Sequence, residues 1–448
     1  MTVDAPTRRP GPESARPGGL GRRQVHAVAA CYFVASFAAL GLPPYLTAIL
    51  PALGDRDGRW AGLLYIVPTV FSALGAPFWG RLADRFGRKR LLLRAQLGLA
   101  VSFLLAGAAE SLTGFTLALV LQGLLGGTFA ATTGYLAAAL DGARLSAALT
   151  LMQGSARAAL VAAPILVGAL SPWIDPHRQY LLMAALPLAA AGLLALLPEP
   201  GRRPGCRQER RQERPPGRRP GPEDAGAFAD GAATGGGLVG GALACGAEAT
   251  AGAAPAAAPR PGPLRVLYAF EFAFVFATIV SFPYLISLAE QRLPGISGTT
   301  AGVLFALPHL CYLVFAARTH TAFLHRPHTG LALGFAFVAL GLAGHAAARS
   351  MPAFAAARLL LGAGLTLGLV CLAVLAAEAA HGRAPGRMFG TLEFVSKGGA
   401  VAAGAVAALA NSRFDATAPV LAGTAAALLA ALAATAFISP VRQRRSHP

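Results

Sequence analysis

Charged side chains inside apolar stretches are the first candidates for chemistry in this sequence. Arg157 follows Gln153 by four residues, and Glu393 and Lys397 show the same spacing further along the chain. Residues four apart share one helix face, so the acid and the lysine can neutralise each other. Arginine binds a carboxylate bidentately, and lysine binds it as a point charge. These four residues are therefore candidate contacts for an anionic solute, with mutual structural pairing as the alternative.

Glu271 is the leading candidate for proton exchange. It lies in the apolar run Tyr268–Phe274, where flanking phenylalanines would remove it from water and no cation stands nearby in sequence. A carboxyl group that couples to protons must gain and lose a proton at working pH, which burial makes possible. Glu393 is the second candidate, because Lys397 should hold it ionised. The alternative for Glu271 is a polar residue that faces a cytoplasmic vestibule.

The rest of the chain shows the medium in which these charges must lie. Of its 448 residues, 55% are hydrophobic and 13% are charged, and the mean hydropathy is +0.55. Soluble proteins carry about 25% charged residues, so lipid must surround most of this chain. A charge at membrane depth is costly and normally faces a cavity or a partner. The sequence therefore predicts an all-α integral membrane protein.

Twelve apolar stretches approach the length of about 20 residues that a spanning helix needs. Their expected ranges are 25–50, 60–80, 90–109, 113–139, 145–170, 179–197, 264–289, 299–317, 329–347, 352–378, 386–410 and 416–439.

The distribution of Lys and Arg predicts how these helices are oriented. Cytoplasmic loops carry an excess of cations. Most of the 38 Lys and Arg fall in the N-terminal tail, between the second and third stretches and in the central loop. The loops expected outside hold few, namely Arg56, Arg59, Arg178, Arg292, Arg349 and Arg413. We therefore expect both termini in the cytoplasm, and this topological pattern argues against nucleic-acid binding.

The same pattern divides the chain into two bundles and three polar segments. We expect a cytoplasmic tail at 1–24, one six-helix bundle at 25–198 and another at 264–439, with a C-terminal tail at 440–448. Residues 199–263 are rich in Arg, Gly, Pro and Ala. Such composition cannot bury enough apolar surface to fold, so a flexible cytoplasmic linker is expected there.

An internal repeat relates the two bundles. Ala61–Pro68 resembles Ala301–Pro308, 240 positions later, and Pro44–Leu46 resembles Pro283–Leu285 at nearly the same offset. Gln153 and Arg157 align with Glu393 and Lys397 at the offset of 240. Repeated bundles with a solute site at their interface are the plan of many secondary transporters. We therefore expect these polar pairs to face each other across a pseudo-twofold axis.

The loop after the second stretch carries the most specific motif. It reads Gly80-Arg-Leu-Ala-Asp84-Arg85-Phe-Gly87-Arg88-Lys89-Arg-Leu-Leu. This resembles the signature loop of the major facilitator superfamily (MFS), G-x-L-a-D-r-x-G-r-k-x-x-l. The resemblance implies twelve helices in two pseudo-symmetric bundles and covers all but the tails and linker. It also implies that Gly80, Asp84, Arg85, Gly87, Arg88 and Lys89 latch the halves together on the cytoplasmic side.

Two further patterns resemble drug-proton antiporters of this superfamily in part. Antiporters carry an arginine before a Gln-Gly pair in their fourth helix, whereas here Leu119 precedes Gln122-Gly123. The repeat-equivalent place carries Arg358, which we add to the candidate substrate contacts. Ala163-Pro164 and Gly168 match part of the motif of the fifth helix. The resemblance thus implies proton-coupled efflux of a drug-like or carboxylate-bearing, siderophore-type solute.

Other activities lack their motifs in the sequence. The only lysines, Lys89 and Lys397, do not stand in a Walker A setting, and the five cysteines have no ligand spacing. We therefore expect neither an enzyme nor a metal or other cofactor, and we expect a monomer in a bacterial plasma membrane. An uptake permease for a small organic anion and a transporter-like receptor or scaffold are the alternatives.

Overall fold

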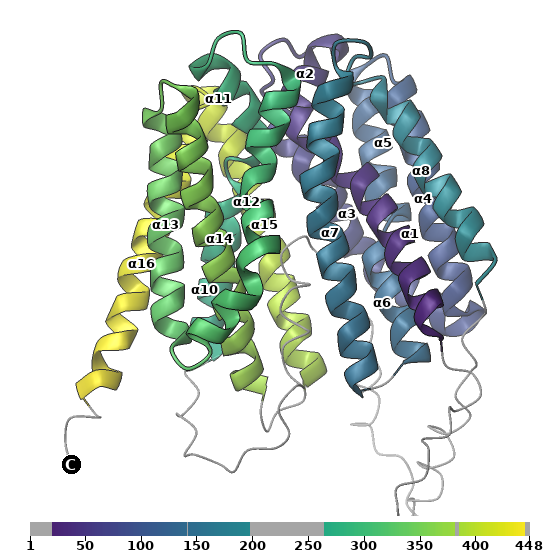
Figure 1. The fold of residues 1–448 in the computed structure, drawn as a ribbon. Coiled ribbons are helices and arrows are strands. Elements are labelled where there is room, and N and C mark those ends of the chain that lie inside the picture. The colour runs from purple at the N-terminus through teal and green to yellow at the C-terminus, as the bar shows by residue number, and fades with distance from the viewer. Residues whose placement is uncertain (1–19, 141, 198–263, 381–384, 444–448) are drawn as a thin grey trace, which may run out of the picture.

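The chain folds into two bundles of helices that stand side by side (Figure 1). The computed structural model describes residues 20–140, 142–197, 264–380 and 385–443, and the described residues are helical with no strand. Both expected tails and the linker at 199–263 fall largely or wholly outside these residues. In a bilayer every backbone polar group must find a partner within the protein, and a helix satisfies this within one segment.

The first bundle contains the helices before the linker. Its elements are α1 (Arg22–Gly41), η1 (Pro43–Tyr45), α2 (Leu46–Ile49), η2 (Leu50–Leu53), α3 (Ala61–Phe86), α4 (Arg88–Ala108), α5 (Leu112–Leu125), α6 (Thr128–Ala139), α7 (Gly142–Leu170) and α8 (Gln179–Ala195).

The second bundle repeats this order. Its elements are α10 (Leu264–Ile279), η5 (Phe282–Tyr284), α11 (Leu285–Arg292), α12 (Gly298–Phe323), α13 (Pro327–Ala347), α14 (Met351–Ala380), α15 (Pro385–Arg413) and α16 (Ala418–Gln443).

The length and hydropathy of these helices confirm a multi-pass membrane protein. Nine helical segments in the described ranges are long and apolar enough to cross a membrane. Three shorter apolar segments, Ala61–Ala76, Leu112–Leu125 and Gln179–Ala195, occupy the other expected spans. At those three positions the count of twelve stays a prediction.

The fourth expected span is broken into two helices. The sequence predicts one helix over 113–139, but α5 ends at Leu125 and α6 begins at Thr128 because Gly127 adopts a left-handed conformation with φ of +73°. The break leaves carbonyl groups without helical partners. Trp79 donates its indole N–H to the Leu124 carbonyl at 2.6 Å, and Arg94 donates to the Gly126 carbonyl at 3.4 Å. Side chains of α3 and α4 therefore stabilise the break.

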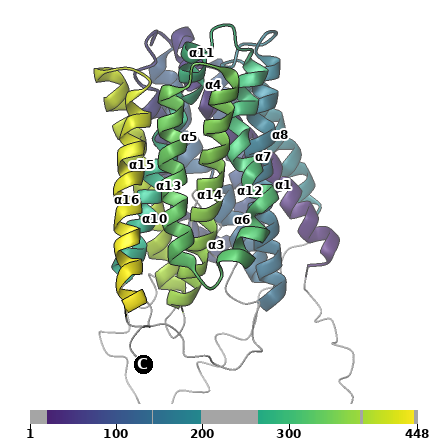
Figure 2. The same cartoon turned by 60° about the vertical axis from the view of Figure 1, so that its left-hand side comes forward.

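Two pairs of helices join the bundles. α7 packs against α12, and α3 packs against α15. In Figures 1 and 2, α1 begins and α16 ends at the same, lower end of the molecule, while α2 and α11 lie at the upper end. The arrangement leaves the interface between α1, α3, α7, α10, α12 and α14 at the centre of the protein.

Candidate functional site

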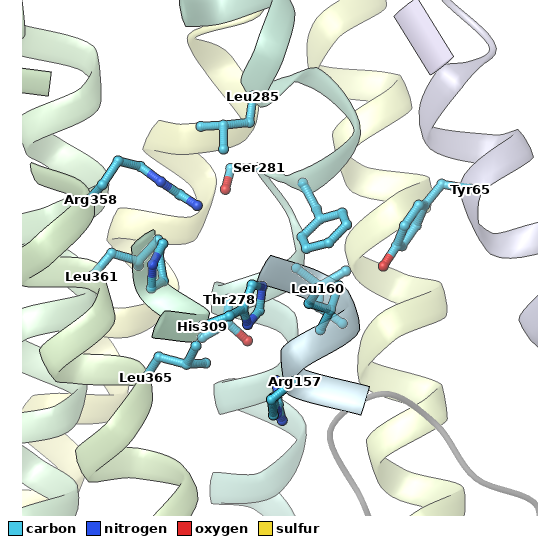
Figure 3. A pocket seen from close by; sticks show the side chains of 13 residues that line it. Tyr65, Arg157, Leu160, Thr278, Ser281, Leu285, His309, Arg358, Leu361 and Leu365 are labelled. Atoms are coloured by element: carbon cyan, nitrogen blue, oxygen red, sulfur yellow. The ribbon is translucent and has the colours of Figure 1, made fainter. Parts of the chain in front are cut away.

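A small cavity lies in the central interface between the two bundles (Figure 3). Its volume of about 50 Å³ has room for roughly three or four waters. Its walls are mostly apolar or aromatic. Four of its polar residues are buried: Arg157, Arg358, His309 and Ser281. The complete lining is Tyr65, Arg157, Leu160, Thr278, Ile279, Ser281, Phe282, Leu285, Pro308, His309, Arg358, Leu361 and Leu365.

Arg157 enters the cavity from the first bundle. It lies in α7, and its side chain is only 2% exposed. Its guanidinium carbon lies 5.2 Å from the centre of the Tyr312 ring in α12, which is a cation–π contact across the two bundles. His309, also in α12, lies within its electrostatic range. The structure thus places this predicted residue at the interface, where the repeat argument expects a solute site.

Arg358 enters from the second bundle and is fixed by the backbone of α12. Pro308 has no N–H, so the Leu304 carbonyl one turn earlier has no helical donor. Arg358 of α14 donates its Nε–H to that carbonyl at 2.7 Å and an Nη2–H to the Phe305 carbonyl at 2.7 Å. These bonds use two of the five N–H groups of the guanidinium. Arg358 is therefore both a brace for a proline-bent helix and a wall of the cavity.

The other predicted polar residues lie in the interior but do not line this cavity. Lys397 Nζ lies 4.0 Å from Glu393 Oε1, as their spacing of four predicts, and both side chains are buried. Glu271 of α10 is fully buried, adjacent to Ser396 of α15 and within electrostatic range of Glu393. Gln153 is buried in α7. The predicted contact of Gln153, Glu393 and Lys397 with a solute stays a prediction.

The signature loop lies at the lower end of the first bundle. Gly87 separates α3 from α4 with φ of +96°, a conformation that favours glycine. Arg88 donates to the Gly134 carbonyl at 3.1 Å, and Lys89 donates to the Ala195 and Leu197 carbonyls at the end of α8. Arg85 packs its guanidinium over the Phe86 ring.

These contacts leave the predicted role of the signature loop open. These hydrogen bonds of Arg88 and Lys89 lie within the first bundle, whereas the expected latch would connect both bundles. The side chain of Asp84 falls outside what the structure describes. A cytoplasmic latch between the halves therefore stays a prediction.

Glycine contacts bring the two bundles together at the upper end. A Cβ at Gly168 of α7 would lie 2.0 Å from the Gly298 carbonyl oxygen of α12, and one at Gly62 of α3 would lie 2.6 Å from the Gly404 carbonyl oxygen of α15. Only glycine allows two backbones to approach so closely. We call these four residues, two on each bundle, the upper closure.

Two tyrosines related by the internal repeat add hydrogen bonds to the upper closure. Tyr45 of η1 donates its hydroxyl to the Pro164 carbonyl at 2.7 Å and lies 3.3 Å from the Gly298 carbonyl of the other bundle. Tyr284 of η5 donates to the Arg59 carbonyl at 3.1 Å and accepts from the Gly62 N–H at 3.1 Å. Tyr284 thus donates its hydroxyl to the other bundle, whereas Tyr45 donates mainly to its own bundle and makes a longer contact with the other.

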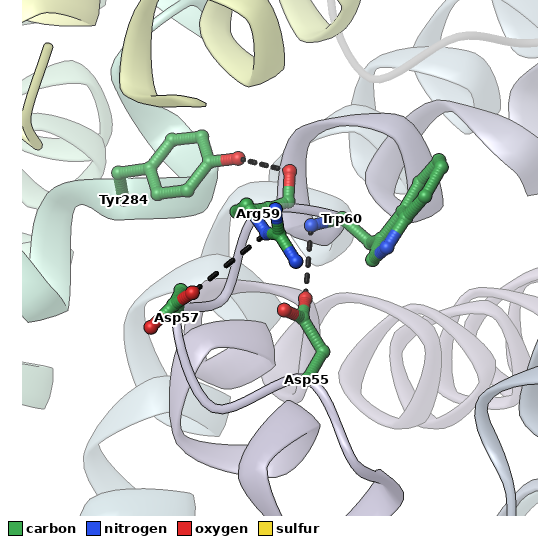
Figure 4. A network of polar contacts seen from close by, with 5 residues as sticks. All are labelled: Asp55, Asp57, Arg59, Trp60 and Tyr284. Carbon is green, nitrogen blue, oxygen red and sulfur yellow. Dashed lines mark hydrogen bonds and ion pairs between the residues drawn. The ribbon is translucent and has the colours of Figure 1, made fainter. Parts of the chain in front are cut away.

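The loop that receives Tyr284 is itself held in place (Figure 4). The buried carboxylate of Asp55 accepts a hydrogen bond from the Trp60 N–H at 3.0 Å. Asp57 lies 3.8 Å from the Arg59 guanidinium, where both side chains are exposed. The backbone bond of Asp55 is the stronger constraint, because an exposed ion pair contributes little. The Arg59 carbonyl therefore stands in a preformed position for Tyr284.

We predict that Tyr45→Phe and Tyr284→Phe each weaken the upper closure. Each change removes only a hydroxyl, and one hydrogen bond contributes about 0.5–1.5 kcal/mol. The ratio of closed to open molecules at the upper end should therefore fall by a factor of roughly two to ten for each variant. Alkylation of Ala408→Cys, in a cysteine-free background, would measure the opening, because Ala408 of α15 is buried against Gly62 of the other bundle.

A third tyrosine provides the control. Tyr180 is buried in the first bundle and packs edge-on against Phe103 and Phe115. Tyr180→Phe should leave alkylation at position 408 at the rate of the parent protein. Equal alkylation rates in all four proteins would show that the tyrosine hydroxyls do not hold the upper end closed.

The sequence pattern missed two kinds of residue that the structure brings forward. His309 lies in the cavity directly after Pro308, and its position inside a predicted span was the available signal, since an ionisable residue there suggests function. Tyr45 and Tyr284 belong to the repeated Pro-Tyr-Leu motif, which revealed the duplication but not the contacts across it. Those contacts depend on how the two bundles dock.

Known proteins resemble parts of this sequence. A protein of Enterobacter lignolyticus named Multidrug resistance protein MdtG is 36% identical over 161 residues, which are 34% of this chain and 38% of that protein. The protein of the same name from Citrobacter koseri is 44% identical over 88 residues, or 19% of this chain and 22% of that protein. The matched stretches therefore span well under half the length of these curated relatives.

Solved structures resemble nearly the whole chain. The crystal structure of the human organic anion transporter MFSD10 (TETRAN) gives a TM-score of 0.59 at 21% identity and covers 92% of this chain and 99% of that one. An auto-inhibited POT family peptide transporter gives a TM-score of 0.61 at 18% identity, covering 93% and 97%. At these identities the likeness shows a shared fold.

The family comparison extends across both bundles. The family model described as Major Facilitator Superfamily matches residues 28–326, from α1 to just past the end of α12. The signature loop between α3 and α4 lies within this stretch. Most of the residues that line the cavity do so as well. Because the match covers well over half of the chain, the chain belongs to the Major Facilitator Superfamily and is a membrane transporter rather than an enzyme.

Proposed function

We propose that this transporter exports a small amphipathic organic carboxylate in exchange for protons, by alternating access of the central cavity to the two sides of the membrane. The observation that carries the proposal is the presence of guanidinium groups from both bundles, Arg157 and Arg358, in one interface cavity.

The cavity favours an anionic solute. A buried guanidinium is stabilised by a carboxylate, which it can bind through two parallel hydrogen bonds. The residues that line the cavity, all within the described part of the chain, include no carboxylate. Leucines and aromatic rings form most of its walls, so the solute should carry an apolar body beside its charge.

The relatives support export as the direction. The two MdtG proteins are named for multidrug resistance, and removal of a drug from the cell is the simplest way for a transporter to confer it. The partial antiporter motifs at Pro164 and Gly168 favour the same direction. Uptake of an organic anion would use the same cavity and is tested by the orientation of the vesicles below.

Glu271 supports coupling to protons. It is a fully buried carboxyl group on α10, and Glu393 lies within its electrostatic range on the neighbouring α15. Two carboxyl groups so placed resist being ionised together, so one of them can carry a proton through the cycle. Lys397 stands beside Glu393. Glu271 is therefore the better proton carrier of the two.

Alternating access requires an interface that can close and open at each end. The upper closure joins the bundles through four glycines and two tyrosines. With both termini in the cytoplasm, the upper end faces outward, so this conformation would load its solute from the cytoplasm. The cavity of about 50 Å³ must widen before it can admit an organic acid.

The proposal is tested with radiolabelled phenylacetate and inside-out vesicles that contain the purified protein. Acidification of the vesicle lumen should drive uptake by the wild type, and Arg157→Ala should lower the initial rate at least about 10-fold, since one lost charge-assisted contact corresponds to roughly 1.5–3 kcal/mol. Arg349→Ala is the matched control, because Arg349 is exposed at the end of a helix.

Three other outcomes would reject parts of the proposal. Transport of cationic dyes without any organic acid would reject the anionic class. Normal uptake by Arg157→Ala would reject this cavity as the site. Gradient-driven uptake only in right-side-out vesicles would identify an importer.

A further inference from the structure

His309 has an unused hydrogen-bonding group inside the cavity. The side chain is 7% exposed, and its Nδ1 has no hydrogen-bond partner among the described residues. Its ring packs at a tilt against Phe305, with 6.0 Å between ring centres. A buried polar atom without a partner costs about 1–3 kcal/mol. A ligand atom that pairs with this ring would recover that cost.

Arg358 is held in a fixed position relative to His309. The guanidinium bonds to the Leu304 and Phe305 carbonyls, which lie about one helical turn before His309 on α12. Three of its five N–H groups remain after these two bonds. Arg358 is thus bonded to the part of α12 that carries His309. Its guanidinium and the imidazole can therefore contact two neighbouring groups of a single molecule.

Ser281 completes this part of the cavity. Its side chain is buried just after the end of α10 and lines the same cavity as Arg358 (Figure 3). We call Ser281, His309 and Arg358 the polar corner. Leu285, Leu361 and Leu365 surround it with apolar surface. All three residues of the polar corner belong to the second bundle, so it should stay intact while the bundles move.

We infer that the polar corner selects a carboxylate that carries a hydroxyl group on the adjacent carbon, with Arg358 binding the carboxylate and His309 binding the hydroxyl. This inference rests on the proposed function, because it specifies the solute of the same cavity. A neutral imidazole has one donor and one acceptor nitrogen, and a hydroxyl can pair with either. An ammonium group in that place would stand beside the guanidinium and be repelled.

The expected selectivity follows from the groups that would be left unpaired. A site built to bond a hydroxyl discriminates strongly against an analogue that lacks it, since the buried polar group then stays unsatisfied. An apolar site would show no such preference. We expect the wild type to prefer the hydroxy acid by at least about 10-fold, the factor that 1.4 kcal/mol gives.

Mandelate and phenylacetate test the inference, because they share a ring and a carboxylate and differ by one hydroxyl. Each acid is measured as a competitor of radiolabelled phenylacetate uptake into inside-out vesicles. The ligand-dependent thermal shift of the purified protein is measured as well. His309→Phe should lower the preference, so that mandelate and phenylacetate compete equally and the ratio of their affinities falls to about one. His309→Asn, whose amide can occupy the Nδ1 position, should keep part of the preference.

A second buried histidine provides the matched control. His345 packs edge-on against Phe354 in the second bundle and does not line the cavity. His345→Phe should keep the preference of the wild type. The comparison in the wild type does not depend on whether any variant folds.

The outcomes distinguish this inference from the proposed transport of an organic carboxylate, on which it rests. If the wild type handles mandelate and phenylacetate equally, or His309→Phe keeps the preference, the polar corner does not read a hydroxyl and the carboxylate proposal stands. If the wild type binds and transports neither acid, the carboxylate proposal itself fails.

Discussion

Glu271→Gln should abolish accumulation of the solute driven by a proton gradient. Glutamine keeps the shape of a protonated carboxyl group but cannot release a proton, and Glu271 is fully buried in α10. A gradient of one pH unit stores about 1.4 kcal/mol per proton, which supports roughly 10-fold accumulation in a one-to-one exchange. In the variant the ratio should fall to about one, whereas exchange of labelled for unlabelled solute should continue.

Two controls make this result specific. Glu110→Gln changes an exposed acid in the loop between α4 and α5 and should accumulate solute as the wild type does. Glu393→Gln tests the neighbouring carboxyl group, which is paired with Lys397. If Glu271→Gln accumulates solute normally and Glu393→Gln does not, the proton carrier is Glu393.

The fold could be predicted because lipid imposes simple rules on sequence. Long apolar segments, cations in the inner loops and a repeat of about 240 residues together define two bundles of spanning helices. The break at Gly127 was missed, since hydropathy is the same for one bent segment and for two helices. The side chains of Trp79 and Arg94, which lie on other helices and bond the freed carbonyls, help to stabilise the break.

The candidate site could be predicted only in part. Arg157 was identifiable as a charge at membrane depth and Arg358 as the repeat equivalent of an antiporter motif, and both line the cavity. The double role of Arg358 was not, because the carbonyl that it bonds is freed by Pro308 on another helix. Lys397 was expected to face Arg157 through the repeat, but the cavity does not include it. Packing between helices decides such placements, and the hydropathy of a segment carries little information about it.

The second large effect is expected from Gly168→Ala. A Cβ at this position would lie 2.0 Å from the Gly298 carbonyl oxygen and 2.5 Å from the Tyr45 hydroxyl oxygen. Ordinary contacts of that kind are more than 3 Å, and the first neighbour is backbone that cannot rotate away. The upper ends of α7 and α12 must therefore separate. We expect transport to fall at least about 10-fold because the closed state is destabilised by more than 1.4 kcal/mol.

Gly154→Ala is the control on the same helix, since no atom lies within 4 Å of a Cβ there. Spin labels at Trp173 and Phe414, exposed residues that follow α7 and α15 at the upper end, would report the distance between the bundles in a cysteine-free background. Gly168→Ala should lengthen that distance, and Gly154→Ala should not. If Gly168→Ala transports normally and keeps the short distance, the backbones do not approach as closely as the upper closure requires. A longer distance with normal transport would show instead that closure at this end does not limit the cycle.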